Sequence, residues 1–587
     1  MYFFEGIGYR SKPGKIVEIN ILMRIILTIS LYCLCISFAN AQSSKYFKKV
    51  IGLGYPNFEV GGFVKSLPNE GYLTGQERFY QTGGADGLIV KTDLYGNVIF
   101  DTCFQDAIST VTIKSVTIKN GKYYFTGAKR INASTNFKSF LMSTDSLANI
   151  LYENIIGDSI FSSFGYHINQ TLDNGFVVAG TFYQLNQFYS GNLIQIDSTG
   201  SKIWDQIYNA PNINIALWVE ALSDSNYIFT GITNHILGSG DIWIKNISYY
   251  GNEIWGKNYH FVGDFTTSGY CIKQNSKKEF VVCGSSGNSG VTDNPLILKT
   301  DSNGNEIWIK KILNQSGQNP SGELARVIIL DDSTYIFCGS TLVGIGMGIH
   351  QMHLLKTDSS GNTIWSRRFT MNQTDETYGL DIDTTSDGGF ILSGTINQSG
   401  DQNIFLVKTN CLGFINAPNA DFSVLWNGSI ATFYNLSDRA DTCIYYFGDG
   451  DSAVVLLTDT TPVVHTYAGS GPYTPYLLAY ACGEVDTLYQ TIYTGINNEY
   501  ELIEKSFTIF PNPAAEQITL SCIIPHHLSE VKLLITDLTG RVISSNQIQG
   551  NPRELEIDIS YLNNGSYLVS LDHNGNILAS RKLMVVR

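Results

Sequence analysis

The chain has 587 residues, which is enough for several domains because single hydrophobic cores rarely grow past roughly 250 to 300 residues. Its composition is 43% hydrophobic and only 15% charged, with 56 Gly and 34 Tyr, which favours short strands and tight turns over long amphipathic helices. A formal net charge of -14 without a cluster of Lys and Arg argues against a nucleic-acid partner, which would require neutralised phosphates. We therefore expect an all-β protein with several domains.

The first part of the chain contains a candidate export signal. Met23 is followed by Arg24, an apolar run over residues 25–38 and the sequence Ala-Asn-Ala that ends at Ala41. A positive end, an apolar stretch too short to span a bilayer comfortably and a small-x-small site are the features of a secretory signal. We predict that the true start is Met23 and that cleavage falls between Ala41 and Gln42. A retained anchoring helix is the alternative.

A seven-fold repeat dominates residues 43–416. One marker is an apolar run ending in Gly, and a second marker, 19 to 22 residues further on, is a turn of the form D-x-x-G-x-x-x-W or a close variant. Each unit is predicted to form four antiparallel strands, and such a sheet must stack on its neighbours around an axis to bury both faces. The pattern therefore predicts a seven-bladed β-propeller. The first marker occurs at Gly75, Gly127, Gly180, Gly231, Gly284, Gly339 and Gly394.

The two ends of the repeat region complement each other. The seventh unit stops at Ile415 and lacks a fourth strand, whereas the segment KYFKKVIG from Lys45 resembles the fourth-strand segments that begin at Trp308 and Trp365. We predict that this N-terminal strand completes the last blade. Closure of the ring would remove the sheet edge that otherwise invites aggregation.

The two ends of each predicted blade differ in their loops. Short turns rich in Asp, Asn, Ser and Gly lie at one end, whereas longer loops rich in Tyr, Phe, Asn and Gln lie at the other, which we call the display end. Scaffolds commonly place binding groups on such long loops. Tyr80, Tyr183 and Tyr189 are therefore candidate ligand-binding residues, and ordinary loop packing is the alternative for each.

Residues 417–497 follow a different pattern. The runs YYFGDGDS from Tyr445 and HTYAGSGPYTPYLLAY from His465 resemble the polycystic-kidney-disease (PKD) domain, although Tyr446 stands where that family usually has Asp. The resemblance implies a small β-sandwich that serves as a spacer or a binding module at cell surfaces.

Residues 507–587 carry four blocks in order: FTIFPNPAAEQITL, VKLLITDLTGRVI, LNNGSYLVSL and RKLMVVR. These blocks resemble the type A C-terminal sorting domain of type IX secretion, which is found in Bacteroidota. The resemblance implies passage through the periplasm, recognition by the type IX secretion machinery and a final location outside the cell or on the outer-membrane surface. Residues 498–506 are expected to form a linker between the two tail domains.

The cysteines after the export signal have spacings that match no zinc site. Cys443 and Cys482 fall within one small domain and are candidates for a disulfide in an oxidising compartment, with two free thiols as the alternative. Cys283 and Cys338 occupy equivalent positions in successive repeats, so we interpret them as small buried residues.

The sequence contains no established catalytic motif. His350 and His353 form an H-x-x-H, but side chains three apart on a strand point to opposite faces, so we expect no shared metal ion. Asp449 and Asp451 are compatible with a calcium site, although we favour a role in shaping their turn through bonds to the backbone. We therefore predict no cofactor and no metal.

Two classes of function stay open. The first is a monomeric, non-enzymatic binding or adhesion protein whose propeller loops bind an extracellular glycan or protein. The second is a secreted carbohydrate-active enzyme with its active site at the propeller axis. Several inward carboxylates at the mouth of the channel would favour the enzyme.

Overall fold

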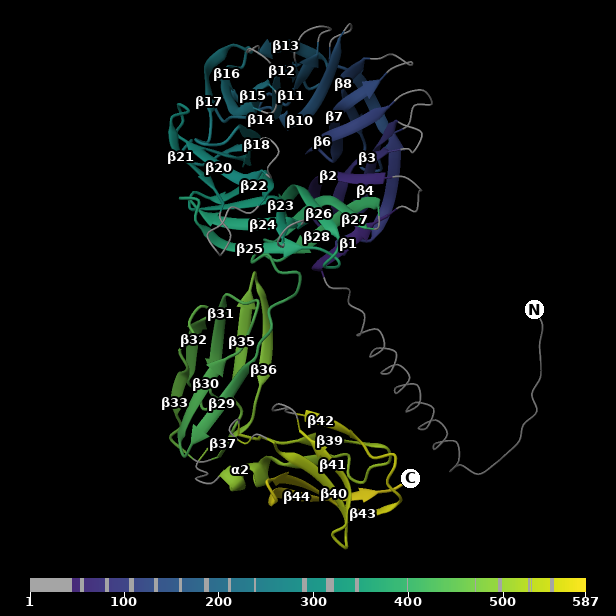
Figure 1. Ribbon diagram of the computed structural model, residues 1–587, viewed down its shortest axis with the longest axis vertical. Coiled ribbons are helices and arrows are strands. Elements are labelled where there is room, and N and C mark those ends of the chain that lie inside the picture. Colours follow the sequence, from purple (N-terminus) through teal and green to yellow (C-terminus); the bar gives the residue numbers. More distant parts are fainter. Residues whose placement is uncertain are drawn as a thin grey trace, which may run out of the picture. The chain divides into compact units, whose positions relative to one another are not determined.

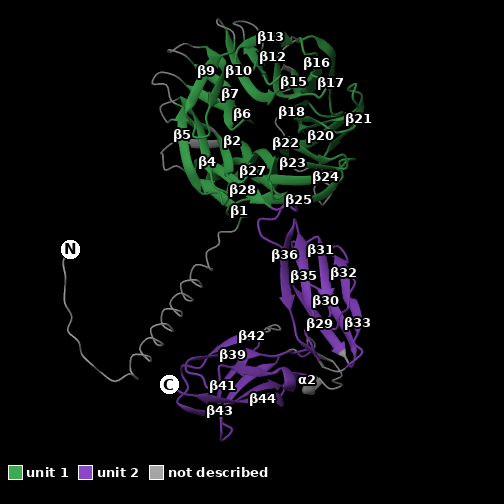
Figure 2. Cartoon of the chain, turned by 180° about the vertical axis from the view of Figure 1, so that it is seen from behind, with its two compact units in different colours: residues 1–409 green, residues 410–587 purple. Residues whose placement is uncertain are grey.

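A computed structural model describes much of the chain. The chain divides into two compact units, residues 1–409 and 410–587, which are coloured green and purple in Figure 2. No helix within the described ranges combines the length and the apolarity that a membrane crossing requires. The described ranges are 45–52, 58–79, 84–104, 110–130, 136–157, 161–183, 189–208, 213–236, 239–287, 293–312, 321–343, 348–398, 400–469, 471–494, 499–525, 528, 530–548 and 554–587.

In its described residues, the first unit contains seven blades of four antiparallel strands arranged as a ring (Figure 1), and one parallel bridge, between Gly240 and Thr266, joins the fourth and fifth blades. Within six blades the strands pair in chain order, and in the seventh the N-terminal strand takes the fourth place. The first strand of each blade lies towards the centre of the ring and the fourth lies at the rim (Figure 1). The prediction of a seven-bladed propeller is confirmed.

The seven first strands are β2 (Phe58–Leu67), β6 (Val111–Lys119), β10 (Ser162–Gln170), β14 (Ile213–Ala221), β18 (Thr266–Gln274), β22 (Gly322–Asp331) and β26 (Glu376–Thr384). The second strands are β3 (Gly71–Phe79), β7 (Lys122–Arg130), β11 (Phe176–Tyr183), β15 (Tyr227–Ile236), β19 (Phe280–Gly287), β23 (Thr334–Val343) and β27 (Phe390–Gln398). The third strands are β4 (Ala85–Thr92), β8 (Phe137–Thr144), β12 (Tyr189–Ile196), β16 (Ser239–Ile247), β20 (Asn294–Thr300), β24 (Ile349–Asp358) and β28 (Asp401–Thr409). The fourth strands are β5 (Val98–Phe104), β9 (Ile150–Ile155), β13 (Lys202–Tyr208), β17 (Glu253–Tyr259), β21 (Glu306–Lys311), β25 (Thr363–Phe369) and β1 (Phe47–Ile51).

Strand β1 closes the ring by pairing with β28, as the sequence predicts. The two strands are antiparallel, with Phe47 opposite Lys408 and Ile51 opposite Ile404. Phe47 and Ile51 are both buried and join the hydrophobic core shared by the first and last blades. The pairing therefore covers the outer edge of β28, which would otherwise expose unpaired backbone groups.

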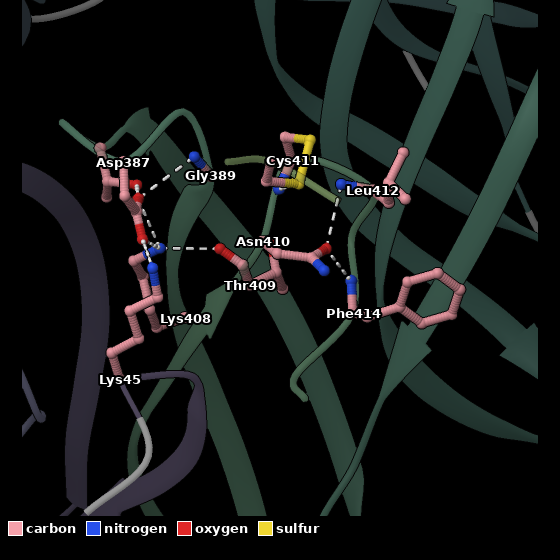
Figure 3. Close-up of polar contacts among 11 residues, drawn as sticks. Lys45, Asp387, Gly389, Lys408, Thr409, Asn410, Cys411, Leu412 and Phe414 are labelled. Atoms are coloured by element: carbon pink, nitrogen blue, oxygen red, sulfur yellow. Dashed lines mark hydrogen bonds and ion pairs between the residues drawn. A yellow bond between two sulfur atoms is a disulfide. The ribbon is translucent and has the colours of Figure 1, made fainter. Parts of the chain in front are cut away.

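An ion pair reinforces the same blade (Figure 3). Lys408 Nζ lies 3.0 Å from Asp387 Oδ1, and Lys45 Nζ lies 3.5 Å from Asp387 Oδ2. Burial alone would raise the pKa of Asp387, but the hydrogen bond from Thr385 and the charge of Lys408 together lower it to about 2. The carboxylate is therefore charged at neutral pH and links the turn between β26 and β27 to Lys408 of β28 and to Lys45, just before β1.

Turns of the D-x-x-G type or a close variant contact the preceding blade in five of the described blades. In the fifth blade, Asp301 Oδ1 accepts hydrogen bonds from the amides of Asn303 and Asn305 at 2.8 and 2.7 Å, which shapes the turn. Gly304 has a φ of 73°, and a Cβ built there would lie 2.6 Å from Cζ3 of Trp255 in the preceding blade. Glycine therefore allows both the turn and the stacking. The same contact between a turn glycine and the preceding blade's aromatic ring occurs for Gly96 and Phe47, Gly200 and Tyr152, Gly251 and Trp204, and Gly361 and Trp308.

Two β-sandwiches make up the second unit. In the middle sandwich, two sheets enclose a core that includes Phe422, Phe433, Tyr445 and Leu477. One sheet contains β29 (Phe422–Asn427), β30 (Ile430–Asn435) and β33 (Val463–Thr466). The other contains β32 (Ser452–Leu456), β31 (Thr442–Tyr446), β35 (Tyr476–Ala481) and β36 (Glu484–Tyr489), and β34 (Gly471–Tyr473) pairs with β37 (Ile492–Thr494).

The C-terminal sandwich includes a short helix that the sequence analysis did not predict. The expected linker at residues 498–506 contains helix α2 (Glu499–Ser506), and its Ile503 is buried in the core of the sandwich. The apolar pair Leu502–Ile503 accounts for the difference, because its burial fixes the segment on the sandwich. One sheet contains β38 (Thr508–Phe510), β39 (Gln517–Ser521) and β42 (Glu554–Asp558). The other contains β41 (Val542–Gln547), β40 (Lys532–Asp537), β43 (Gly565–His573) and β44 (Asn576–Val585).

Candidate functional site

The inner strands of the ring satisfy their free edges with side chains from neighbouring blades. Every first strand contains a one-residue register shift against its second strand, and the side chain after the shift can reach the next blade. Between the last and first blades, Asp381 accepts a hydrogen bond from the amide of Val64 and Asp383 accepts one from the amide of Ser66, each at 2.9 Å. These axial carboxylates therefore hold the ring together at its centre.

A second group of axial side chains forms a charge-balanced network around Trp218. The ring of His167 stacks on Trp218 with centroids 3.4 Å apart, and the Arg326 guanidinium lies 4.6 Å from the Trp218 ring. Glu220 Oε1 accepts hydrogen bonds from Trp218 Nε1 at 2.5 Å and from Lys273 Nζ at 2.6 Å. Burial lowers the pKa of His167, and the charges of Lys273 and Arg326 lower it further, so the imidazole is neutral at physiological pH.

The display end of the third blade, together with Phe137 of the second blade, carries a group of aromatic side chains, which we call the aromatic patch: Phe137, Phe164, Tyr166, Tyr183 and Tyr189. Tyr183 at the end of β11 lies opposite Tyr189 at the start of β12, with ring centroids 4.8 Å apart. Phe164 shares this face of the blade through the alternation of β10, and its ring lies 5.2 Å from that of Phe137 in the second blade. Tyr189 is 36% exposed and the other four are half-buried, so the patch offers an aromatic surface to a ligand.

The structure thus brings together two of the three candidate tyrosines. Tyr80 lies outside the described residues, as do Ala41 and Gln42 of the expected cleavage site. Sequence analysis missed Phe164 and Tyr166 because they lie on the first strand of the blade, and it missed Phe137 because it selected only tyrosines from the long segments. A count of aromatic residues at the display ends of the strands would have found them.

The disulfide prediction was wrong in one partner. Cys482 pairs with Cys411, with Cα atoms 5.6 Å apart, and Cys443 is a buried free cysteine. Cys443 lies inside β31, opposite Ala479 and within the sandwich core, where its side chain packs among apolar neighbours. Cys482 instead occupies the turn after β35, at the surface.

The turn that holds Cys411 explains why it is available for the disulfide. Asn410 Oδ1 accepts hydrogen bonds from the amides of Leu412 and Phe414 at 3.0 and 2.9 Å, which is the turn geometry of the propeller repeats (Figure 3). Cys411 follows Asn410 in this ordered turn, so its side chain projects from a fixed backbone.

Two further sequence candidates have structural roles in the described residues. His353 is buried and bonds to Ser366 Oγ at 2.8 Å, whereas His350 stacks on Tyr378 with centroids 5.2 Å apart, so the two histidines have separate neighbours. Burial, with a smaller contribution from the charge of Arg368, lowers the pKa of His353 to about 4.

The FGDG turn of the middle sandwich places Asp449, Asp451 and His465 together. One ligand atom from each lies within 4.8 Å of the others, so the group has the composition of a cation site. Asp449 Oδ1 accepts a hydrogen bond from the Asp451 amide at 3.1 Å, and Asp449 Oδ2 lies 2.6 Å from His465 Nε2. One oxygen of Asp449 thus bonds the turn backbone, and the other bonds His465 of β33.

Comparisons with known proteins identify the C-terminal sandwich. Residues 508–586 match the family model described as the secretion system C-terminal sorting domain. The chain carries a type IX sorting domain. A sorting domain of this kind directs export from the cell or to its surface, so the protein acts outside the cytoplasm. No curated protein matches the chain.

Solved structures with similar folds include several proteins of different activity. An ulvan lyase of polysaccharide lyase family PL25, bound to a sugar, is 9% identical, with 61% of this chain and 96% of that chain covered and a TM-score of 0.42. YCF48 bound to D1 peptide is 10% identical, with 63% and 96% covered and a TM-score of 0.36. The endo-arabinase from Bacteroides thetaiotaomicron is 12% identical, with 51% and 93% covered and a TM-score of 0.28. These low similarities carry no inference about function.

Proposed function

We propose that the protein travels through the periplasm and leaves the cell by type IX secretion, and that its propeller then binds an extracellular glycan without transforming it. The sorting domain supports the export step. The aromatic patch at the display end of the third blade is the observation that carries the binding step.

Aromatic side chains suit a sugar ligand for two physical reasons. The apolar C–H faces of a sugar ring pack on an aromatic ring, and the hydroxyl of Tyr adds a polar group at the same place. A tyrosine also loses little conformational entropy on binding, because its side chain has only two rotatable angles. Tyr183 and Tyr189 lie on adjacent strands of a closed ring, so the scaffold holds them in place before the ligand arrives.

The axial carboxylates support a binding role over the enzymatic alternative. Glycoside hydrolysis requires two carboxyl groups free to act on the substrate. Asp381 and Asp383 accept backbone hydrogen bonds, and Glu220 is bonded to Trp218 and Lys273. These three groups are therefore committed to the ring rather than to a reaction.

The middle sandwich fits the role of a spacer between the binding domain and the sorting domain. Its chain is tied by the Cys411–Cys482 disulfide, which limits unfolding in an oxidising compartment. We propose that the protein works as a monomer, since one ring presents the whole aromatic patch.

A pull-down with insoluble polysaccharides and a glycan array would test the proposal. Tyr183→Ala combined with Tyr189→Ala should weaken binding at least tenfold, because both stacking rings are lost. Tyr250→Ala is the matched control, since Tyr250 is 78% exposed in a turn at the opposite end of the fourth blade. Equal binding by all variants, or turnover of any bound polysaccharide, would contradict the proposal.

A further inference from the structure

Two cysteines lie directly opposite each other in the first hairpin of the fifth blade. Cys271 belongs to β18 and Cys283 to β19, and the two residues are partners in the antiparallel pairing of these strands. Directly opposite residues in such a pair have Cα atoms roughly 4.5 to 5.5 Å apart and side chains on the same face of the sheet. Disulfides span Cα separations of roughly 4.4 to 6.8 Å. The backbone therefore holds the two cysteines at a distance that a disulfide can bridge.

The two thiols interact with each other and are shielded from water. Cys271 is 0% exposed and Cys283 is 1% exposed, and both belong to a core that the fifth blade shares with its neighbours. Burial raises the pKa of the Cys283 thiol, and its hydrogen bond with the Cys271 side chain raises it further. The two residues therefore form a pair of thiols rather than two separate buried side chains.

The propeller repeat does not require cysteines at this position. Cys271 follows the register shift of β18, and its counterparts in the other first strands have unlike partners across the hairpin. These equivalent pairs are Phe63 with Gly75, Ser115 with Thr126, His167 with Ala179, Trp218 with Thr230, Arg326 with Cys338, and Asp381 with Ser393. The fifth blade thus departs from its neighbours at two facing residues that complement each other.

Two other buried cysteines provide a contrast. Cys338 lies opposite Arg326 on one neighbouring strand and Leu354 on the other. Cys443 lies opposite Ala479 in the middle sandwich. Neither has a second cysteine across the strand, so both serve as internal controls for any chemistry of the facing pair.

We propose that Cys271 and Cys283 form a disulfide within the fifth blade during passage through the periplasm, as a second crosslink in addition to Cys411–Cys482. The inference goes beyond glycan binding, and it rests on the export route of the proposed function. Disulfides form and persist in oxidising compartments of this kind.

The reaction requires an oxidant, which we assign to a thiol oxidase that carries a reactive disulfide. One cysteine loses its proton, and its sulfur attacks the disulfide of the oxidase, giving a mixed disulfide and one free thiol of the oxidase. The second cysteine then loses its proton and displaces the oxidase from the mixed disulfide. The two thiols together lose two protons and two electrons, and the oxidase disulfide gains them to become a dithiol. Because the folded ring buries both thiols, the reaction precedes packing of the fifth blade against its neighbours.

The crosslink would secure a strand that carries one of the axial charges. Lys273 lies two residues after Cys271 on β18, and its Nζ donates to Glu220 Oε1 at 2.6 Å. Opening of the hairpin between β18 and β19 would disturb this contact with the fourth blade. A disulfide across the hairpin limits such opening and lowers the conformational entropy of the unfolded chain.

Peptide mapping of the full exported chain by mass spectrometry would test the disulfide. The chain is unfolded without reductant in the presence of an alkylating reagent, and trypsin then separates the two cysteines by cleavage after Lys273. We expect the peptides of Cys271 and Cys283 to be joined, with a mass lower by two hydrogen atoms than that of the separate peptides. The peptides of Cys338 and Cys443 should be alkylated.

The Cys411–Cys482 disulfide is the internal control for the export route. If its peptides are joined while those of Cys271 and Cys283 are alkylated, the inference is wrong and the export route stands. If both pairs are alkylated, the inference and passage through an oxidising compartment are both contradicted. A bond from Cys283 to any other cysteine would also overturn the inference.

A stability measurement distinguishes a crosslink from simple packing of two buried thiols. The variant with Cys271→Ala and Cys283→Ala is compared with the unaltered chain by urea denaturation, with and without reductant. Reductant opens Cys411–Cys482 in both proteins, so this contribution cancels in the comparison. We expect the ratio of the two unfolding constants to be at least tenfold larger without reductant than with it. An equal ratio under both conditions would show that the two cysteines only fill space in the core.

Discussion

The two ends of the propeller blades differ in how much they repeat. Two residues recur at the turn end of the propeller blades. One is an Asp that shapes the hairpin, and the other is a Gly that leaves room for an aromatic side chain of the preceding blade. On the first strands, the residue at the register shift varies between blades: it is Tyr166 in the third and Tyr270 in the fifth, but Lys114 in the second, Leu217 in the fourth and Ala325 in the sixth. Repetition therefore follows the physical demands of the ring, and variation falls where nothing in the ring requires a particular side chain.

The comparison predicts that changes at the closing strand and the turn end reduce stability, whereas changes at the display end mainly affect binding. The largest effect should come from a chain that lacks residues 45–51. Burial of Phe47 and Ile51 alone is worth about 3 to 6 kcal/mol, and the edge of β28 would lose its partner. We expect loss of the propeller's cooperative melting transition and aggregation in size-exclusion chromatography. The control is a chain that begins at Ser44 and keeps residues 45–51. Equal melting temperatures of the two chains would contradict the role of β1.

The next largest effect should come from Gly304→Ala. The new methyl group would have to occupy the place of the Trp255 ring at a φ of 73°, at a cost of about 3 kcal/mol from strain and overpacking. Gly388→Ala is a matched control, because Gly388 has a φ of 76° and no atom within 4 Å of the added methyl, so only about 1 kcal/mol of backbone strain applies. Chemical denaturation gives the loss of unfolding free energy for each variant. The difference between the two losses measures the contribution of the contact between the Gly304 turn and Trp255. Equal losses of unfolding free energy in the two variants would mean that this packing contact does not stabilise the fold.

A smaller effect with a distinct pH dependence is expected for Asp387→Asn. The folded-state pKa of about 2 lies below the unfolded value of about 3.9, so the carboxylate stabilises the fold at neutral pH by about 2 kcal/mol. This stabilisation is present above about pH 4 and is lost as the pH falls through about 2. The difference in unfolding free energy between the two proteins should therefore shrink between pH 4 and pH 2. A difference that stays constant over this range would argue against the ion pair with Lys408.

The smallest effect should have the opposite sign and occur at the display end. Burial and the nearby Asp293 raise the pKa of Glu323, so its ionised form disfavours folding at neutral pH. Glu323→Gln should therefore raise the melting temperature at pH 7, and the gain should shrink as the pH falls and vanish at about pH 3, below the unfolded pKa of about 4.3, where the carboxyl is protonated in both states. A lowered melting temperature at pH 7 would instead show that Glu323 supports the fold.

The sequence predicted the propeller, its closing strand and the sorting domain because each depends on signals that are local or repeated along the chain. A turn such as Asp301–Gly304 is set by neighbouring residues, and the seven copies reveal the period. The missing fourth strand of the last unit could likewise be matched to the segment at Lys45 without any coordinates.

Contacts between distant residues became visible only in the folded ring and sandwiches. The pairing of Cys482 with Cys411 rather than Cys443 depends on which side chains face the core and which face the surface. The stacking of His167 on Trp218 depends on two blades meeting side by side, and no spacing along the chain encodes it. Local turn chemistry can be deduced from a few adjacent residues, but proximity across blades arises only when the chain has packed.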